Sequence, residues 1–169
     1  MADSTAASPS TEAWIAAFHR MVDAQRRLLG RTQGIAARTE YDGVGEGGDH
    51  SLVIDREAEE IAFVELEALH REGAEFTAIS EERGEVVFGD GSSPTRVVID
   101  PIDGSLNARR TLPSFALSIA VASGPSMADV ELGFVHDFGS GEDFIRPGTG
   151  ADQSYGGGND RFVIGNLAK

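Results

Sequence analysis

The chain has 169 residues, of which 40% are hydrophobic, none is cysteine and 28 are acidic against 14 lysines and arginines, so the formal charge is −14. This length suits one globular domain with a sizeable core, and the lack of cysteine excludes disulfides, a thiolate nucleophile, thiolate zinc sites and iron–sulfur clusters. The acidic balance opposes unassisted binding to nucleic acid or to an anionic membrane, so we expect cationic, neutral or metal-bridged partners.

The first ten residues predict no regular structure. Residues 1–10 are small, polar and acidic, which is typical of a disordered leader. They lack the basic start and the apolar run of a secretory signal, and nowhere do 18 apolar residues follow one another. We therefore expect a soluble, cytoplasmic protein without a membrane partner.

Two amphipathic helices are predicted next. Ser10 offers an N-cap, and apolar residues then recur at helical spacing until Gly30. The glycine-rich segment 42–50 is predicted to be a loop, after which Asp55 opens a second helix that ends at Gly73. The glutamates of this second helix are expected to form a solvated acidic face: Glu57, Glu59, Glu60, Glu65 and Glu67.

Short apolar segments bounded by Gly, Pro, Asp or Ser predict strands. These segments are 76–79, 86–88, 97–99, 115–122 and 130–135. Two helices followed by closely spaced strands indicate an α+β fold, with a helical layer packed on a largely antiparallel sheet. The glycine-punctuated tail, 148–169, is predicted either to be poorly ordered or to add an edge strand through 162–164.

The segment 97–107, Val-Val-Ile-Asp-Pro-Ile-Asp-Gly-Ser-Leu-Asn, carries the most informative chemistry. A β-branched strand delivers Asp100 at its end, Pro101 is expected to stop the ladder, and Gly104 permits a tight turn into a short helix. The carboxylates of Asp100 and Asp103 are thereby held close together. Two adjacent anions are unfavourable unless a hard cation such as Mg²⁺ lies between them.

The same turn offers further ligands. The carbonyl of Ile102 is a natural third metal ligand, and the N–H groups of Gly104 and Ser105 would face an anion bound to the metal. An Asp-Pro-x-Asp-Gly pattern also suits an ordinary turn whose aspartates cap their own backbone. The residues of this turn alone leave both interpretations open.

Two other acidic segments accompany this motif. Ile-Ser-Glu-Glu-Arg-Gly, 79–84, ends a predicted strand, and Gly-Asp-His-Ser-Leu-Val-Ile-Asp, 48–55, leads to an acid at a helix start. In this order the three segments resemble the inositol monophosphatase superfamily of Mg²⁺-dependent, lithium-sensitive sugar phosphatases. Its signatures are Gly-Asp-x-Ser/Thr followed by Asp-x-x-Ala-Glu, paired glutamates, and Asp-Pro-Ile-Asp-Gly-Ser/Thr-x-Asn. The resemblance covers roughly residues 12–145 and implies the N-terminal half of a layered αβαβα sandwich.

The resemblance implies a role for each matching residue. The implied metal ligands are Glu81, Asp100, the carbonyl of Ile102, and Asp103. The implied phosphate-binding residues, with main-chain N–H groups at the last two, are Ile102, Asp103, Gly104 and Ser105. The implied catalytic residues, which orient the attacking water or hold it through a metal, are Asp55, Ser105 and Glu81.

The activity that this resemblance implies is hydrolysis of a small sugar or inositol phosphate monoester by a metal-activated water. The enzyme types are inositol monophosphatase or fructose-1,6-bisphosphatase, with histidinol phosphate or 3′-phosphoadenosine 5′-phosphate as alternative substrates. Mg²⁺ is the expected cofactor, Mn²⁺ a substitute and Li⁺ an inhibitor.

The sequence departs from the superfamily in its second half. The Trp-Asp-x-Ala signature, whose aspartate ligates a second metal, is missing, because the only tryptophan is Trp14. We therefore expect 11–147 to be a metal- and phosphate-binding N-terminal domain, natural or truncated, without the C-terminal substrate domain. The alternative function is that of a catalytically impaired metal- and phosphate-binding fragment. An apolar face left uncovered would favour a homodimer.

The remaining reactive residues give weaker signals. The four histidines, at 19, 50, 70 and 136, are scattered along the sequence, and His50 is expected to be a solvated loop residue. Arg109 and Arg110 would either reach a second phosphate or form a cation pair at a helix C-terminus. Ser105 is not expected to be a hydrolase nucleophile, because no histidine stands where it could act as the base.

Overall fold

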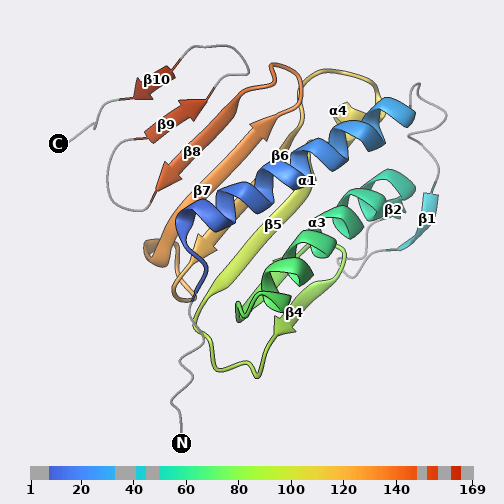
Figure 1. Ribbon diagram of the computed structural model, residues 1–169. Helices are drawn as coiled ribbons and strands as arrows, with labels where there is room; N and C mark the ends of the chain where they lie inside the picture. Colours follow the sequence, from blue (N-terminus) through green and yellow to red (C-terminus); the bar gives the residue numbers. More distant parts are fainter. Residues whose placement is uncertain (1–7, 33–40, 45–49, 148–151, 156–160, 165–169) are drawn as a thin grey trace, which may run out of the picture.

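The computed structural model describes residues 8–32, 41–44, 50–147, 152–155 and 161–164. Two long helices, α1 (Thr11–Arg31) and α3 (Val53–Arg71), lie side by side on one face of a broad sheet (Figure 1). A short helix, α4 (Ser105–Arg109), and a 3₁₀ turn, Met127–Asp129, lie in connections. Among the described helices, none is both long and apolar enough to cross a membrane.

The strands of the main sheet are β3 (Phe76–Ser80), β4 (Gly84–Phe88), β5 (Arg96–Asp103), β6 (Ala116–Ala122), β7 (Val130–Asp137), β8 (Asp143–Pro147), β9 (Asp152–Tyr155) and β10 (Arg161–Ile164). Their spatial order is β10-β9-β8-β7-β6-β5-β3-β4. Neighbouring strands are antiparallel except β3 and β5, which are parallel. The predicted α+β fold, with helices on a largely antiparallel sheet, is confirmed.

The predicted strands correspond to β3 through β7, and the predicted edge strand at 162–164 corresponds to β10. The prediction that 42–50 is only a loop is wrong in part. There β1 (Tyr41–Val44) and β2 (His50–Leu52) pair as a two-stranded antiparallel ribbon, and 45–49 lie outside the described residues. Glycine permits extended backbone as well as turns, so its abundance alone does not exclude a strand.

Strand β8 was not predicted, because its apolar run, Phe144-Ile145, is only two residues long and follows closely on a turn. Asp137 builds that turn: its Oδ1 accepts the N–H of Gly139 at 2.7 Å and that of Ser140 at 3.3 Å. Gly139 approaches the loop before β6 so closely that a Cβ there would lie 1.7 Å from the carbonyl oxygen of Pro113. This hairpin is therefore shaped by one aspartate side chain and one close backbone approach, which leave little pattern in the sequence.

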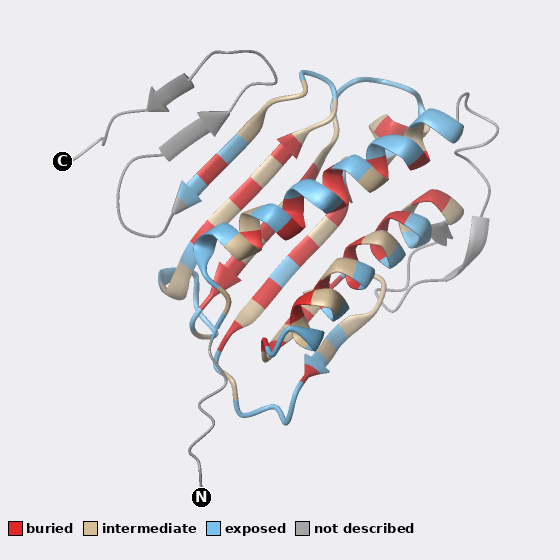
Figure 2. Cartoon of the chain, in the orientation of Figure 1, coloured by how far each residue is buried: buried red, intermediate tan, exposed pale blue. Residues whose placement is uncertain are grey.

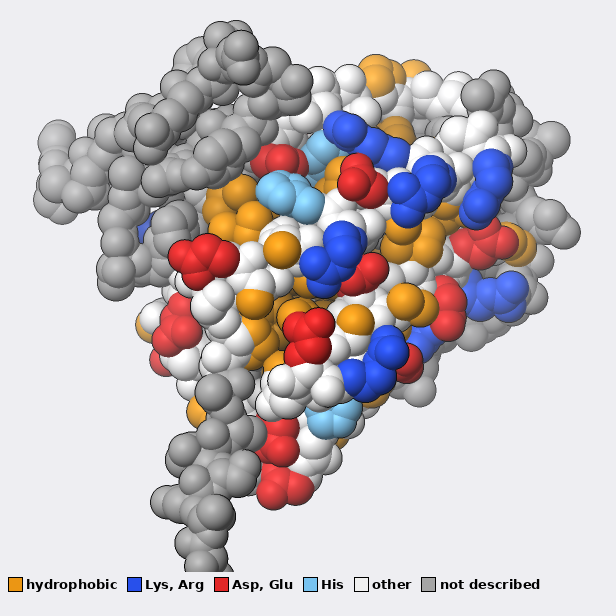
Figure 3. All heavy atoms as spheres, in the orientation of Figure 1, with side chains coloured by type: hydrophobic (Ala, Val, Ile, Leu, Met, Phe, Trp, Pro, Cys, Tyr) orange, Lys and Arg blue, Asp and Glu red, His pale blue; other side chains and the backbone are white. Residues whose placement is uncertain are grey.

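Helix α1 begins where the sequence predicts, because the Ser10 side chain accepts the N–H of Ala13 at 3.2 Å. Its apolar stripe is buried against the sheet, as the burial colours in Figure 2 show. The Trp14 ring meets the Phe76 ring of β3 edge-on, with 5.3 Å between their centroids. Each such buried side chain contributes about 1.5–3 kcal/mol through the hydrophobic effect. The outward face of the helical layer carries interspersed acidic and basic side chains (Figure 3).

The strands alternate between the two faces of the sheet. In β5, Val97 and Ile99 are buried beneath the helices, whereas Val98 points to the opposite face and is 48% exposed. By the pairing register, Val87 of β4 and Phe144 of β8 lie on the same face as Val98, and they are also exposed. The core therefore lies between the sheet and the two helices.

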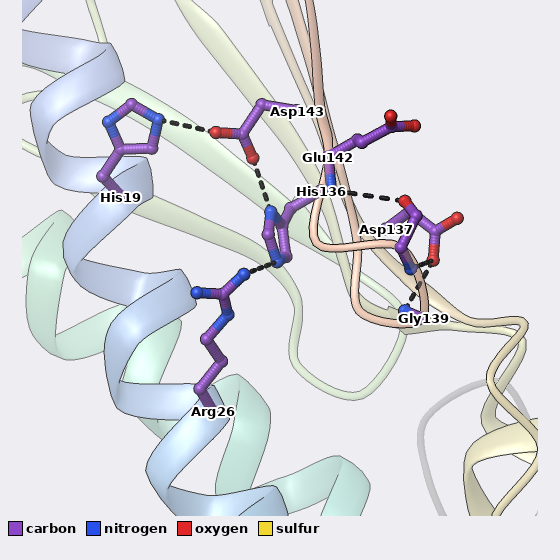
Figure 4. Close-up of polar contacts among 8 residues, drawn as sticks. His19, Arg26, His136, Asp137, Gly139, Glu142 and Asp143 are labelled. Atoms are coloured by element: carbon purple, nitrogen blue, oxygen red, sulfur yellow. Dashed lines mark hydrogen bonds and ion pairs between the residues drawn. The ribbon is translucent and has the colours of Figure 1, made fainter. Parts of the chain in front are cut away.

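A chain of side-chain hydrogen bonds fastens α1 to the β7–β8 hairpin (Figure 4). Arg26 Nη2 lies 3.2 Å from Nε2 of the buried His136, whose Nδ1 lies 2.5 Å from Asp143 Oδ1. Asp143 Oδ2 is 3.1 Å from Nε2 of His19. Because arginine only donates, His136 accepts at Nε2 and donates from Nδ1. Two of the histidines that are scattered in sequence thus share one carboxylate.

Sharing of the Asp143 carboxylate changes the pKa of both His19 and Asp143. The hydrogen bond to Asp143 raises the pKa of His19. Burial alone would raise the pKa of Asp143, but the hydrogen bonds from His136 and His19 lower it to about 2. His19 and Asp143 therefore form an ion pair at pH values above about 2 and below the raised pKa of His19.

We expect this pair to stabilise the fold most at mildly acidic pH. The folded pKa of His19 lies above the unfolded value of 6.5, so its contribution is complete below 6.5 and disappears as the pH rises through the folded value. The contribution of Asp143 is complete above 3.8 and disappears as the pH falls through about 2. Since the His19 side chain is 47% exposed, solvent screening limits the effect to about 0.5 kcal/mol.

Urea denaturation of the wild type and of His19→Gln tests this expectation. The stability lost on substitution should be larger at about pH 5.5 than at about pH 9. An equal loss at the two pH values would show that the charge on His19 does not contribute.

Candidate active site

The parallel pairing of β3 with β5 brings distant acidic segments together. Ser80, the last residue of β3, lies opposite Ile99 of β5. Because parallel strands run in one direction, the residues that follow these two, Glu81 and Asp100, emerge at the same edge of the sheet. Two of the predicted site segments therefore meet through strand topology.

A pocket of about 150 Å³ lies at this edge. Its lining residues are Asp55, Glu81, Glu82, Asp100, Pro101, Ile102 and Ser105. They come from the first turn of α3, the β3–β4 turn, β5 and the start of α4. Four of these side chains are carboxylates, so the pocket favours cations and disfavours an unaccompanied anion.

Asp100 also closes its own turn. Its Oδ1 accepts the N–H of Ile102 at 3.1 Å. Asp100 therefore caps its own turn and also lines the acidic pocket, so the two interpretations of this motif are compatible. The expectation that Pro101 stops the ladder is wrong, since β5 pairs again with β6 at Asp103 after a shift in register. A bulge accommodates the missing N–H of the proline, so the strand resumes beyond it.

Asp103 takes a different position from the other predicted metal ligands. It is exposed and does not line the pocket, and its Oδ2 accepts a hydrogen bond from Ser118 Oγ at 3.3 Å. It is nevertheless near enough for its charge to raise the pKa of Asp100. Glu81, Asp100 and Ile102 are thus brought to one pocket, with Asp103 beside it.

Gly104 shapes the turn into α4. Its φ of 87° is left-handed, and a Cβ there would lie 3.1 Å from the carbonyl oxygen of Ser114. Asn107 reinforces this arrangement, because its Nδ2 donates to the same Ser114 oxygen at 2.8 Å and its N–H to the carbonyl of Gly104 at 2.8 Å. Glycine is therefore required here for both conformation and space.

The pocket keeps like charges close together. Burial raises the pKa of Asp100 to about 6, the charge of Asp103 and that of Glu81 raise it as well, and the N–H of Ile102 opposes them. A carboxyl group with a raised pKa lowers the stability of the folded chain when it ionises. A bound cation would remove this penalty.

The donor chemistry fits Mg²⁺, which prefers carboxylate and carbonyl oxygens and retains several waters. Within the described residues, however, no three His, Asp or Glu side chains are placed closely enough to hold a metal ion. A bound cation would compensate the charge of neighbouring carboxylates and so allow them to come closer together. The residue types thus suit the metal, and their side chains would have to move inward to bind it.

The expectation that Glu59 belongs to a solvated acidic face is wrong. Its side chain is only 2% exposed, and Arg83 Nε donates to its Oε2 at 3.2 Å. Of the other helix glutamates, Glu57, Glu60 and Glu67 are exposed, as predicted. Burial of Glu59 depends on an arginine from a distant turn, which helical periodicity does not reveal.

Gln25 is a second buried polar residue that the sequence analysis missed. Its Nε2 lies 3.3 Å from the carbonyl oxygen of Pro101 and 3.4 Å from that of Ala58. It therefore links α1, α3 and β5 directly behind the pocket. In the sequence, Gln25 can be recognised as an amide side chain within the apolar stripe of α1, between Val22 and Leu28.

The other polar candidates contribute less to the pocket. Arg109 lies in the last turn of α4 and Arg110 caps it, and neither lines the pocket. His70 Nδ1 lies 2.7 Å from the carbonyl of Ala74 beyond the end of α3. The side chain of His50 lies outside the described part of the chain.

Known proteins resemble this chain in sequence. A model of the inositol monophosphatase family matches residues 12–155. A fructose-1,6-bisphosphatase/inositol-1-monophosphatase of Archaeoglobus fulgidus is 32% identical over 109 residues, which cover 64% of this chain and 40% of that protein. A protein of the same name from Methanothermobacter thermautotrophicus is 32% identical over 137 residues, which cover 76% of this chain and 48% of that protein. The chain therefore spans less than half the length of these two relatives.

Solved structures share the fold. An inositol monophosphatase–fructose 1,6-bisphosphatase superposes with a TM-score of 0.64 at 25% identity, covering 90% of this chain and 52% of that one. A fructose-1,6-bisphosphatase of Leishmania major gives a TM-score of 0.67 at 17% identity, covering 89% and 52%, and is evidence for the fold alone.

Substitution Asp100→Asn should stabilise the metal-free chain. Between the unfolded pKa of 3.8 and the folded value of about 6, ionisation of Asp100 progressively lowers stability, and the full penalty is present above 6. After allowance for solvent screening of this half-buried group, we expect a gain of about 1 kcal/mol at neutral pH. Urea denaturation in a chelator measures it, and the gain should vanish near pH 4. A loss of stability at neutral pH would contradict the claim that burial and neighbouring carboxylates make ionised Asp100 destabilising.

Substitution Gly104→Ala should destabilise the chain by about 1–2 kcal/mol, because alanine pays for a left-handed backbone. Gly30→Ala is the matched control, since the residue is helical and a Cβ there would meet no atom within 4 Å apart from its chain neighbours and the backbone of its own helix. Alanine at position 30 should stabilise by about 0.5–1 kcal/mol through helix propensity. Thermal denaturation distinguishes the two, and equal effects would contradict the geometry of the turn.

Proposed function

The chain belongs to the inositol monophosphatase family, and from this we propose that it forms the metal- and phosphate-binding part of a phosphoric monoester hydrolase. The substrate is a small phosphorylated sugar or polyol. One observation carries the proposal: four acidic residues, together with Ile102 and Ser105, line one pocket at the ends of two parallel strands. In this proposal the functional domain is 11–147.

Glu81, Asp100, the carbonyl of Ile102 and, after a side-chain shift, Asp103 hold the metal. Bound Mg²⁺ supplies the positive charge that lets a phosphate dianion enter an acidic pocket, and it acidifies a coordinated water. The carboxylates hold this charge in place and are themselves relieved of mutual repulsion. Mn²⁺ substitutes for Mg²⁺ and Li⁺ inhibits.

Asp55 and Ser105 orient the attacking water. They come from α3 and α4 and line the same pocket, so a water between them can donate to the carboxylate and hydrogen-bond to the hydroxyl. The main-chain N–H groups of Gly104 and Ser105 hold phosphate oxygens at the turn. Attack in line with the leaving alkoxide then releases phosphate without a covalent enzyme intermediate.

A second candidate is binding without turnover. One observation favours it: the described residues hold no preformed group of three metal-binding side chains. In that case the pocket takes up metal and phosphate and releases no product.

Calorimetric titration of the 169-residue chain with Mg²⁺, followed by assays of phosphate release from inositol 1-phosphate and fructose 1,6-bisphosphate, tests the proposal. Asp100→Asn should weaken Mg²⁺ binding at least about tenfold, because it removes a charged ligand. Asp55→Asn should retain Mg²⁺ and lose most phosphate release. Asp90→Asn is the control, since Asp90 is an exposed aspartate that caps Ser92 in the β4–β5 loop.

The possible outcomes separate the candidates. Metal-dependent phosphate release that both pocket variants reduce supports the hydrolase. Metal uptake by the wild type without any release supports binding alone. No uptake of Mg²⁺ or Mn²⁺ by folded wild-type chain would overturn both.

A further inference from the structure

The β3–β4 turn carries two of the pocket carboxylates, Glu81 and Glu82, and ends at Arg83. We propose that Arg83 is a positioning residue that holds Glu81 at the pocket by anchoring this turn to helix α3. The inference rests on the proposed function, since Glu81 is a metal ligand only if that function holds.

Arg83 is held on several sides. Its Nε donates to Glu59 Oε2 at 3.2 Å, and its Nη2 donates to the Glu60 carboxylate. The guanidinium carbon lies 4.3 Å from the centroid of the Phe63 ring, which adds a cation–π contact. The backbone N–H of Arg83 donates to Ser80 Oγ at 3.3 Å, which closes the turn itself. Both the side chain and the backbone of Arg83 therefore fix the turn.

The contact with Glu59 constrains the turn most strongly. The Glu59 side chain is 2% exposed, and within the described residues its Oε1 has no hydrogen-bond partner. Arg83 thus supplies the positive charge that makes burial of this carboxylate tolerable. Loss of one partner of a buried ion pair is costly, because the remaining charge is left uncompensated. The turn cannot leave α3 without incurring that cost.

Helix geometry connects this anchor to the pocket. Glu59 follows Asp55 by four residues, so both lie on the same side of α3. Arg83 follows Glu81 by two residues at the end of β3. The Arg83–Glu59 pair therefore links the carboxylate that orients water with the one that binds metal, and it limits the distance between them.

Lysine would not reproduce these contacts. The planar guanidinium reaches two glutamates at once while its face lies against an aromatic ring, whereas an ammonium group is a single compact charge. Arg83→Lys should consequently neutralise Glu59 and keep the chain folded, yet leave the turn less constrained. This makes it a second variant if Arg83→Ala fails to fold.

The matched control is Arg20→Ala. Arg20 Nε also donates to a glutamate of α3, Glu65 Oε2, at 2.7 Å, but it does so from α1 and neither residue lines the pocket. Its removal reports the general effect of losing an arginine–glutamate pair on α3.

Two measurements on the full 169-residue chain test the inference. In hydrogen–deuterium exchange without metal, amides of the segment 79–85 should exchange about tenfold faster in Arg83→Ala than in the wild type, and Arg20→Ala should leave them unchanged. In calorimetry, Mg²⁺ affinity should fall about tenfold for Arg83→Ala and about threefold for Arg83→Lys, with no change for Arg20→Ala.

A double variant separates anchoring from a direct effect of charge on the metal. If Arg83 acts through Glu59, Glu59→Gln should itself weaken Mg²⁺ binding, and the double variant should bind no more weakly than Arg83→Ala. If the losses of Mg²⁺ affinity in the two single variants add up in the double variant, Arg83 does not act through Glu59.

Wild-type exchange rates and Mg²⁺ affinity in both Arg83 variants would overturn the inference while the proposed function stands. If the wild type itself takes up no Mg²⁺, the proposed function fails, and the exchange measurement still decides whether Arg83 anchors the turn.

Discussion

Parallel pairing of β3 with β5 is the constraint on which the site depends. In a sheet whose other neighbours are antiparallel, this one pair makes two consecutive acidic segments end at the same edge. The chain reaches that arrangement by passing β4 to the outside and returning β5 beside β3. If β5 ran in the opposite direction, Asp100 would lie at the far edge from Glu81, and the same residues would form no pocket.

The topology places anions where they repel one another, and the surrounding residues compensate for this repulsion in two ways. Arg83 neutralises the buried Glu59 beside the pocket, so that carboxylate is stable without a ligand. Within the described residues no such cation pairs with Asp100, and burial with neighbouring negative charge raises its pKa to about 6. The folded chain therefore neutralises its supporting carboxylate, Glu59, internally, whereas the charge of Asp100 would be compensated by a bound cation.

Local patterns in the sequence predict much of the fold and part of the site. The apolar stripe of α1, the β-branched run of β5 and the Asp-Pro-Ile-Asp-Gly turn are each visible within a few residues. The burial of Glu59 and the meeting of His19 with His136 depend on partners far away in the chain, so no local pattern contains them. The strand pairing beyond Pro101 was missed because a missing N–H ends a regular ladder, whereas a bulge lets pairing resume.

Strand β4 ends the sheet on the side away from β10, and its outer backbone groups have no neighbouring strand in the described sheet. Such an edge can add a strand from another molecule, which is a common route to aggregation. Here the strand is five residues long and carries the exposed Glu85, two features that discourage this addition. Both features therefore disfavour the addition of a strand from another molecule at this border of the sheet.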